Sequence, residues 1–370
     1  PIKTRYQESI LQTYLFYDIE TTGLSKSFDQ VLHFAAIRTD LQLKEIDRHE
    51  IKIKLNPDVI PSPYALITHK MGIHEILKGE SEFEAIKHIH TWLNTPGTIS
   101  LGYNTLGFDD EFLRFSFYRN LLKPYTHQFA NQCYRMDIYP MAVMFFLYKK
   151  NVLTWPEKNF KLENINAANK LISGRSHHAM VDVEVTLELA RRLQTEHDMW
   201  EYLHGYFQKE TDSARMQQAQ NEIALCINGK MGSDANYQCA VVFLGNHHHY
   251  KNQSIWLRLD NIDFREITTD TIAEKTWGIS KKPGEPNFIL PCKPRFMQHM
   301  QPDRLQLAEK NRQWLLDHSD MFNEIKQHHL NFKYPEFPQA DSDSRLYISG
   351  FFTNEENFFC QRFHSANLKT

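Results

Sequence analysis

The chain has 370 residues, which is enough for two or three domains, and its hydrophobic and charged fractions are those of a typical globular protein. No apolar run reaches the roughly 20 residues of a membrane-spanning helix, and the N-terminus lacks the apolar core of a secretory signal. The net charge of −3 does not by itself indicate a nucleic-acid-binding protein, although phosphate binding requires only a local basic surface. The five cysteines are scattered and form no C-x-x-C pair, which argues against a zinc ribbon and predicts reduced thiols.

The first part of the chain has the pattern of an α/β domain. Three strands joined by short connections favour an antiparallel meander, and we expect them at 15–20, 31–39 and 46–55. A short buried strand is expected at 98–102. Periodic apolar residues predict the helices, at 64–71, 82–94, 109–120, 136–149, 161–171 and 179–194.

The composition changes after about residue 205, where we place a domain boundary. A polar helical segment at 206–222 is followed by a β-rich region with strands expected at 239–244, 254–259 and 264–267. Residues 300–332 are again helical in pattern, and 335–344 form a linker rich in Pro, Asp and Ser.

Two acids one residue apart, Asp18 and Glu20, end the first apolar strand. Strand residues i and i+2 point to the same face, so these carboxylates project side by side. Two like charges this close repel each other unless a cation lies between them. Carboxylate oxygens suit hard cations such as Mg²⁺, which keep several waters and can be bound beside a phosphate.

Three more candidate residues lie far downstream in the sequence. Asp109 begins a predicted helix directly after the turn at 102–108, His177 precedes the helix at 179–194, and Asp182 lies in the first turns of that helix. We expect the four acids to converge at one end of the sheet, where they would form a metal site. A neutral imidazole can accept a proton near neutral pH, which makes His177 a candidate general base.

These residues carry a resemblance to a known group of enzymes. The motifs Asp18-x-Glu20, Asn104-x-x-x-Phe-Asp109 and His177-x-Ala-x-x-Asp182 resemble those of the histidine-bearing (DEDDh) subgroup of the DEDD 3′→5′ exonuclease superfamily. Further stretches at 34–40, 102–111, 117–120 and 346–353 resemble bacterial exodeoxyribonuclease I. The resemblance is strong over residues 12–205 and weaker over 206–350.

The resemblance implies a fold and domain ranges. The expected fold class is α/β, with a ribonuclease H-like exonuclease domain of mixed sheet and flanking helices at 1–205. A Src-homology-3-like β-barrel domain with helical insertions would follow at 206–345. Residues 346–370 would start a helical C-terminal domain, and we expect that domain to be truncated here.

The resemblance also implies roles for the acids. Two Mg²⁺ ions, which Mn²⁺ is expected to replace, would act at the scissile phosphate. Asp18 would bridge the ions, and Glu20 and Asp182 would complete the coordination of one of them. Asp109 would act on the other through water, His177 would be the general base, and Glu20 would also contact the substrate.

Single-stranded DNA is expected to lie against aromatic and basic side chains. By resemblance, Arg114, Tyr125 and Phe129 are the DNA contacts, although composition alone favours a core position for the two aromatic residues. Lys161 stands where the family usually has a substrate-contacting arginine, and a lysine lacks the bidentate geometry of a guanidinium.

We therefore predict a Mg²⁺-dependent exonuclease that degrades single-stranded DNA from its 3′ end to nucleoside 5′-monophosphates in DNA repair and recombination. It is expected to be a monomeric, cytoplasmic bacterial protein with no membrane partner. By resemblance, single-stranded-DNA-binding protein would dock through its acidic tail on basic residues of the second domain. The alternatives are an RNA 3′-end-trimming exonuclease of the same superfamily and a catalytically inactive nucleic-acid-binding protein.

Overall fold

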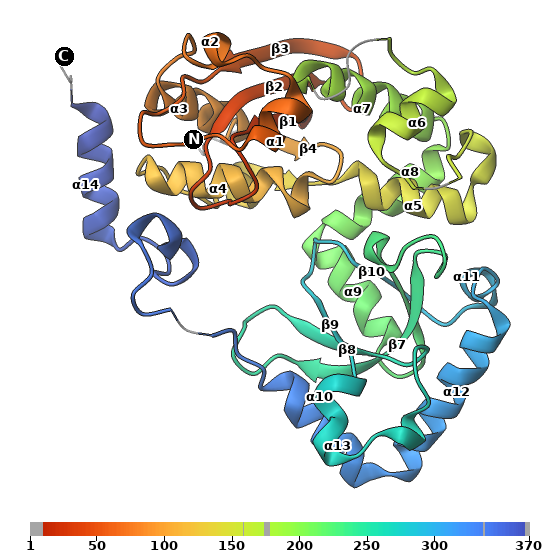
Figure 1. Ribbon diagram of the computed structural model, residues 1–370. Helices are drawn as coiled ribbons and strands as arrows, with labels where there is room; N and C mark the ends of the chain where they lie inside the picture. The colour runs from red at the N-terminus through yellow and green to blue at the C-terminus, as the bar shows by residue number, and fades with distance from the viewer. Residues whose placement is uncertain (1–9, 158, 174–177, 336, 367–370) are drawn as a thin grey trace, which may run out of the picture. The chain divides into compact units, whose positions relative to one another are not determined.

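The computed structural model describes residues 10–157, 159–173, 178–335 and 337–366 (Figure 1). The chain divides into two compact units, of which the first comprises Pro1–Asp137, Lys170–Arg191 and Phe337–Thr370 and the second Ile138–Asn169 and Arg192–Glu336. The domain ranges predicted from the sequence stay a prediction, because compact units defined by contacts need not coincide with folding domains. Among the described residues, no helix combines the length and apolar character needed to cross a membrane.

The first unit is built on a five-stranded mixed sheet with the order β3-β2-β1-β4-β5. Strands β1 (Thr13–Thr21), β2 (Val31–Thr39) and β3 (Glu45–Lys52) form the antiparallel meander predicted from their short connections. Strands β4 (Thr98–Leu101) and β5 (Tyr134–Arg135) run parallel to β1 on its other side. The long crossover before β4 is the connection that a parallel pair requires.

Alternation along β1 separates the core from the acidic face. Leu15, Tyr17 and Ile19 are buried against the helices α3 (Glu82–Leu93) and α4 (Asp109–Arg119), which lie beside the sheet in Figure 1. Side chains in a strand point to opposite faces in turn, so the intervening acids of β1 project from the other face.

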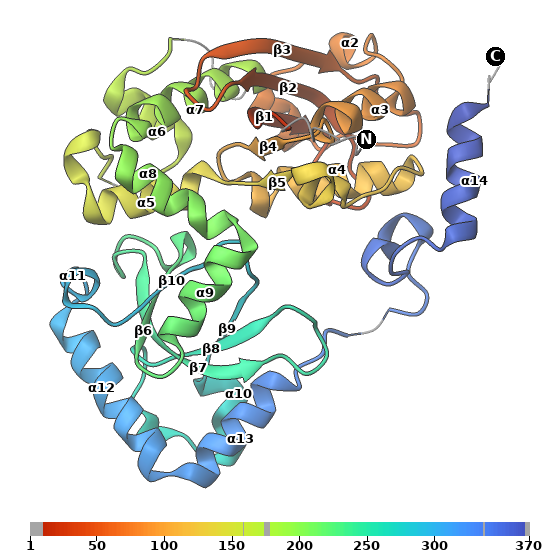
Figure 2. The same ribbon diagram turned by 180° about the vertical axis from the view of Figure 1, so that it is seen from behind.

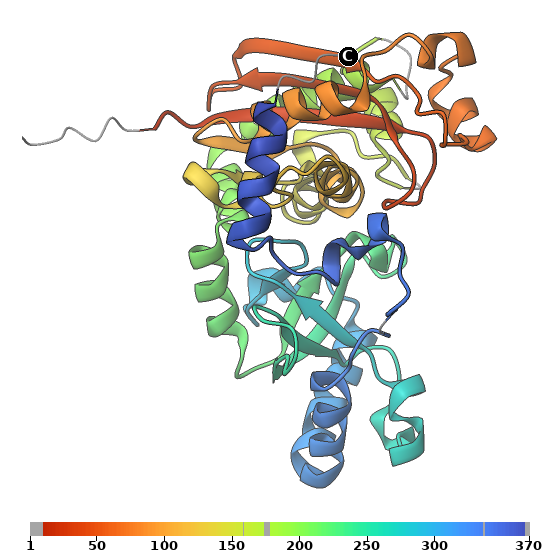
Figure 3. The same ribbon diagram turned by 90° about the vertical axis from the view of Figure 1, so that its left-hand side faces the viewer.

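The remaining helices of the first unit are α1 (Pro63–His69), α2 (Ile73–Ile76), α7 (Ala179–Gln194) and α14 (Asn354–Ser365). Helix α14 packs beside α3, as Figure 3 shows, through the ring of His364, which is stacked at 5.2 Å on that of Phe83. A capping box between Thr353 and Glu356 begins α14.

The second unit contains an antiparallel sheet with the order β10-β6-β7-β8-β9. Its strands are β6 (Ala224–Ile227), β7 (Gln238–Asn246), β8 (Ser254–Arg258), β9 (Gly278–Lys281) and β10 (Phe288–Leu290). Its helices are α5 (Ile138–Tyr148), α6 (Leu162–Asn169), α8 (His197–His204), α9 (Lys209–Ala219), α10 (Ile272–Lys275), α11 (Pro294–Met297), α12 (Pro302–Asp317) and α13 (Ser319–Leu330). Residues of α9 join the core of this sheet, and the helix lies beside it in Figure 2.

The predicted fold class is confirmed, but individual strands of the second unit were predicted less well. The prediction of a strand at 264–267 is wrong, because Phe264–Glu266 form a 3-10 turn. The buried Phe264 donates its backbone N–H to Oδ1 of Asn311 at 2.8 Å, so a side chain provides the hydrogen bond that a neighbouring strand would have given. Strands β6, β9 and β10, each only three or four residues long, were not predicted from the sequence.

Candidate active site

Strand β1 and helix α7 bring three carboxylates together. Asp18 and Glu20 lie opposite Ala35 and His33 of β2, and Asp182 lies in the first turn of α7. One carboxylate oxygen from each of Asp18, Glu20 and Asp182 lies within 4.8 Å of the others. The structure therefore joins residues separated by more than 160 positions in the sequence.

Asp109 is held next to this set by the backbone of β1. It is the first residue of α4 and is 5% exposed, and its Oδ1 accepts a hydrogen bond from the backbone N–H of Ile19 at 3.2 Å. The carboxylate of Asp109 is thus fixed to Ile19, the residue between Asp18 and Glu20. Within the described part of the chain, Asp109 is not one of the three residues that share the 4.8 Å set.

Burial and mutual repulsion disfavour the charged forms of these acids. Burial raises the pKa of Asp18 well above its usual value, and the nearby carboxylates raise it further. Burial and the carboxylate of Asp182 raise the pKa of Glu20 to about 8. The pKa of Asp109 is also raised, again chiefly by burial. A cation at this site would reverse the repulsion, since opposite charge favours the ionised carboxylates.

The donor set fits a hard divalent ion. All of its members are carboxylates that project from a rigid strand and a helix start, and such oxygens are the ligands preferred by Mg²⁺ and Mn²⁺. Asp18, Glu20 and Asp182 would hold one ion, with Asp109 beside them.

A buried acid that the sequence analysis missed shapes the loop before Asp109. Asp137 is 2% exposed, and its carboxylate accepts the backbone N–H groups of Asn104 at 2.8 Å and Leu106 at 3.1 Å. At Gly102 an added Cβ would lie 2.5 Å from the backbone oxygen of Tyr17, so only glycine lets the loop approach β1 this closely.

The predicted general base cannot be placed, because His177 lies outside the described residues. Its neighbour His178 is described and lies directly before α7. The backbone carbonyl of His178 accepts N–H groups from Val181 at 2.8 Å and from Asp182 at 3.1 Å.

The predicted DNA contacts occupy different environments. Arg114 pairs with the buried Asp110 at 2.7 Å and lies over the ring of Tyr125 at 5.7 Å, so part of its role is structural. Phe129 is 59% exposed and lines a hollow of about 370 Å³ together with Tyr125 and Phe351. Lys161 belongs to the second unit, and its side chain is 68% exposed.

Comparison with known proteins identifies the class. Residues 15–190 match the family model RNase_T, described as "Exonuclease". Exodeoxyribonuclease I of Escherichia coli K12 is 28% identical over 369 residues, which cover 93% of this chain and 77% of that protein. Exodeoxyribonuclease I of Buchnera aphidicola (strain APS) is 32% identical over 185 residues, which are 48% of this chain and 45% of that protein.

Solved structures confirm the fold. E. coli exonuclease I in complex with a dT13 oligonucleotide superposes with a TM-score of 0.86 at 24% identity, over 96% of this chain and 81% of that one. Exonuclease I from Methylocaldum szegediense gives a TM-score of 0.84 at 23% identity, over 96% and 79%. Fold, acidic site and family match together define an exonuclease, a hydrolase of phosphodiester bonds. Within that class, the chain is a homologue of exodeoxyribonuclease I.

Proposed function

We propose that this protein removes nucleotides from the 3′ end of single-stranded DNA and releases nucleoside 5′-monophosphates. The observation that carries the proposal is the set of three carboxylates within 4.8 Å at the end of β1, inside a domain that matches the exonuclease family. The names of the relatives support DNA as the substrate, and solved neighbours include E. coli exonuclease I bound to single-stranded DNA. The proposed setting is DNA repair and recombination in the bacterial cytoplasm, with the protein acting as a monomer.

Each site residue has a proposed task. Asp18, Glu20 and Asp182 would hold one divalent ion and Asp109 would serve a second, with Mg²⁺ as the natural ion and Mn²⁺ as a substitute. When bound, such ions polarise the phosphate and make water a stronger nucleophile. His177 would take the proton of the attacking water on a ring nitrogen. The side chain of Phe129 would stack against a base, since aromatic rings bind bases of any sequence.

The test is digestion of a 5′-labelled single-stranded DNA beside the matching RNA and duplex, with Mg²⁺ and with EDTA. We expect a metal-dependent ladder that shortens from the 3′ end of single-stranded DNA only. His177→Ala should bind DNA and lose most turnover, whereas His74→Ala, which removes an exposed histidine of α2, should not change it. Faster loss of RNA would favour the RNA-trimming alternative, and binding without digestion would favour the inactive binding protein.

A hollow in the second unit that is lined by aromatic and charged side chains supports the proposed docking of single-stranded-DNA-binding protein. Aromatic rings of Tyr148, Tyr202 and Phe296 line a space of about 350 Å³, which Lys149 and Arg295 also line. This combination suits an acidic peptide that also carries an apolar residue. A pull-down with full-length and tail-less partner should recover the nuclease only with the tail, and Arg295→Glu should abolish that difference. Equal recovery with both forms would contradict this docking.

A further inference from the structure

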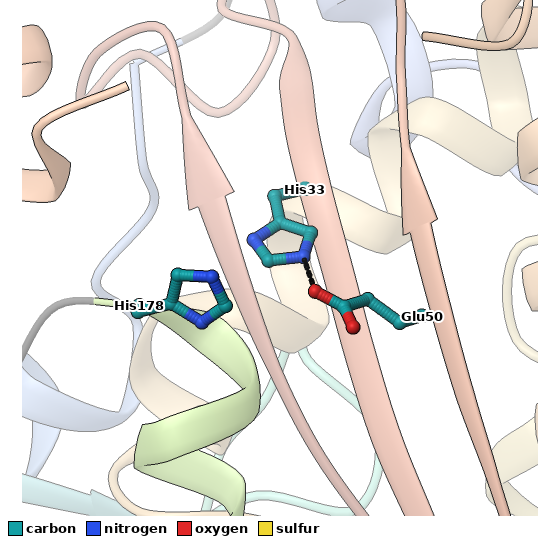
Figure 4. A group of neighbouring side chains, drawn as sticks. All are labelled: His33, Glu50 and His178. Carbon is teal, nitrogen blue, oxygen red and sulfur yellow. Dashed lines mark hydrogen bonds and ion pairs between the residues drawn. The ribbon is translucent and has the colours of Figure 1, made fainter. Parts of the chain in front are cut away.

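A second group of potential metal ligands lies on the acidic face of the sheet, apart from the carboxylates already described. His33 of β2, Glu50 of β3 and His178 before α7 each offer one ligand atom, and these atoms lie within 4.8 Å of one another. Figure 4 shows the ring of His33 between the carboxylate of Glu50 and the ring of His178. Three segments that are distant in sequence therefore meet at this point.

The sheet register explains why these side chains meet. His33 lies opposite Glu20 on β1, and Glu50 lies opposite Ala35, two residues from His33 on the same face. His33 is 1% exposed and donates its Nε2–H to Oε1 of Glu50 at 2.9 Å. The cluster is thus built into the sheet next to the candidate active site.

One ring nitrogen in the cluster is buried and has no hydrogen bond. Nδ1 of His178 finds no partner among the described residues, although burial removes it from solvent. A buried polar atom left in this state costs roughly 1–3 kcal/mol, and such atoms call for an explanation. A metal ion that accepts the lone pair of Nδ1 would explain why this atom has no hydrogen bond.

The ring geometry suits a shared metal ion. The ring centres of His33 and His178 are 5.1 Å apart, at an interplanar angle of 80°. Two imidazoles that share one tetrahedral zinc ion, each with a bond of about 2.0–2.1 Å, place their ring centres about 5 Å apart. A metal-bound imidazole commonly donates its other N–H to a carboxylate, as His33 already does to Glu50.

We propose that His33, Glu50 and His178 form a second metal site that takes a transition-metal ion such as Zn²⁺, with both imidazoles as ligands and Glu50 as the carboxylate partner of His33. Imidazole suits Zn²⁺ and Co²⁺, whereas an oxygen-only set suits Mg²⁺, so the two neighbouring sites differ in the ions they select. Because the carbonyl of His178 accepts the N–H of Asp182, an ion here would also tie the start of α7 to the sheet.

The test uses Co²⁺ as a spectroscopic probe on the full chain after treatment with a chelator. Excess Mg²⁺ is added first, so that the carboxylate site is occupied. We expect one equivalent of Co²⁺ to give the intense visible absorption of a four- or five-coordinate ion, and Zn²⁺ to remove it by displacement. Because this measures binding alone, the result does not depend on nuclease activity.

Two variants and one control locate the ion. His178→Ala should weaken Co²⁺ binding by at least about tenfold, and Glu50→Gln, which keeps a hydrogen-bond acceptor for His33, should also weaken it. His49→Ala removes an imidazole from the adjacent position of β3, on the opposite face of the strand, and should leave the affinity unchanged. Weak absorption typical of a six-coordinate oxygen site, or equal binding by wild type and His178→Ala, would overturn the proposal.

Discussion

Two adjacent residues, Asp109 and Asp110, show how strongly the local environment changes the pKa of identical side chains. Burial raises the pKa of Asp109, whose neighbours at the candidate metal site are other acids. Asp110 is equally buried, but cationic partners hold its pKa well below the usual range. The first acid is therefore available for a cation from solution, whereas the second already has its counter-ions within the protein.

A substitution that removes one charge from the carboxylate set should weaken the metal site without destabilising the fold. We expect Asp18→Asn to lower DNA cleavage by about a thousandfold, since a bound metal contributes several kcal/mol of charge stabilisation. The melting temperature of the metal-free protein should not fall, because ionised Asp18 is repelled by its neighbours. Calorimetric scans with and without Mg²⁺ check this, and a Mg²⁺-induced rise equal to that of wild type would contradict it.

The network around Asp110 is expected to contribute to stability instead. Its carboxylate pairs with Arg114 at 2.7 Å, Arg135 at 2.6 Å and His127 at 2.8 Å. Asp110→Asn removes the buried carboxylate that these guanidinium groups face, which costs roughly 3–5 kcal/mol of unfolding free energy.

Urea denaturation measures this cost, and a matched control comes from an exposed ion pair. Glu84 and Lys87 pair at 3.2 Å on the surface of α3, and Glu84→Gln should change the unfolding free energy by less than about 1 kcal/mol. If the two substitutions destabilise the protein equally, the network around Asp110 has no special role.

At the scale of elements, the active-site geometry depends on how closely the loop after β4 approaches β1. The loop is fixed from one side by Asp137 and from the other by the backbone of Tyr17, the residue before Asp18. It leads directly into α4, so its position also sets that of Asp109.

Gly102→Ala should therefore impair catalysis more than folding. The new Cβ would meet the backbone oxygen of Tyr17 at 2.5 Å, together with the Thr105 methyl group, so β1 or the loop must move. Since misplacement by about 1 Å can cost about a hundredfold in rate, we expect a loss of that order. Gly72→Ala is the control, because a Cβ there meets nothing within 4 Å. Steady-state cleavage rates of both variants test this prediction. A wild-type rate for Gly102→Ala would show that the close approach of the loop to Tyr17 does not set the active-site geometry.

At the scale of the whole molecule, each unit contains a half-buried histidine whose pKa is lowered to about 4 by this partial burial. His90 in the first unit bonds to the backbone oxygen of Lys123 at 3.0 Å, and His329 in the second bonds to Oγ1 of Thr276 at 2.7 Å. In the unfolded chain both would titrate near pH 6.5.

The expected consequence is a loss of stability in mild acid. Because the folded pKa lies below the unfolded value, the contribution of each neutral histidine is complete above about pH 6.5. It declines as the pH falls towards 4, where the unfolded state binds more protons. Urea midpoints between pH 7 and pH 4.5 measure the slope, which His90→Gln and His329→Gln should each reduce. A slope unchanged in both variants would assign the acid sensitivity to other groups.

Much of the fold and the acid set could be predicted from local sequence rules. The period of two in β1 fixed that Asp18 and Glu20 share a face, and the meander and α7 were predicted within a few residues of their bounds. These features depend on residues close in sequence, where backbone geometry alone decides the outcome.

Only the tertiary structure decided which partners the remaining side chains have. It assigned Arg135 to Asp110, Asp137 to the loop before Asp109, and His178 to a cluster with His33. Such contacts join residues from separate elements, and hydrogen bonding and charge pairing between them depend on how helices and strands pack. The sequence by itself determined which acids are candidates for a metal site and on which elements they lie. The packing determined how deeply they are buried, which charges they face and which other groups surround them.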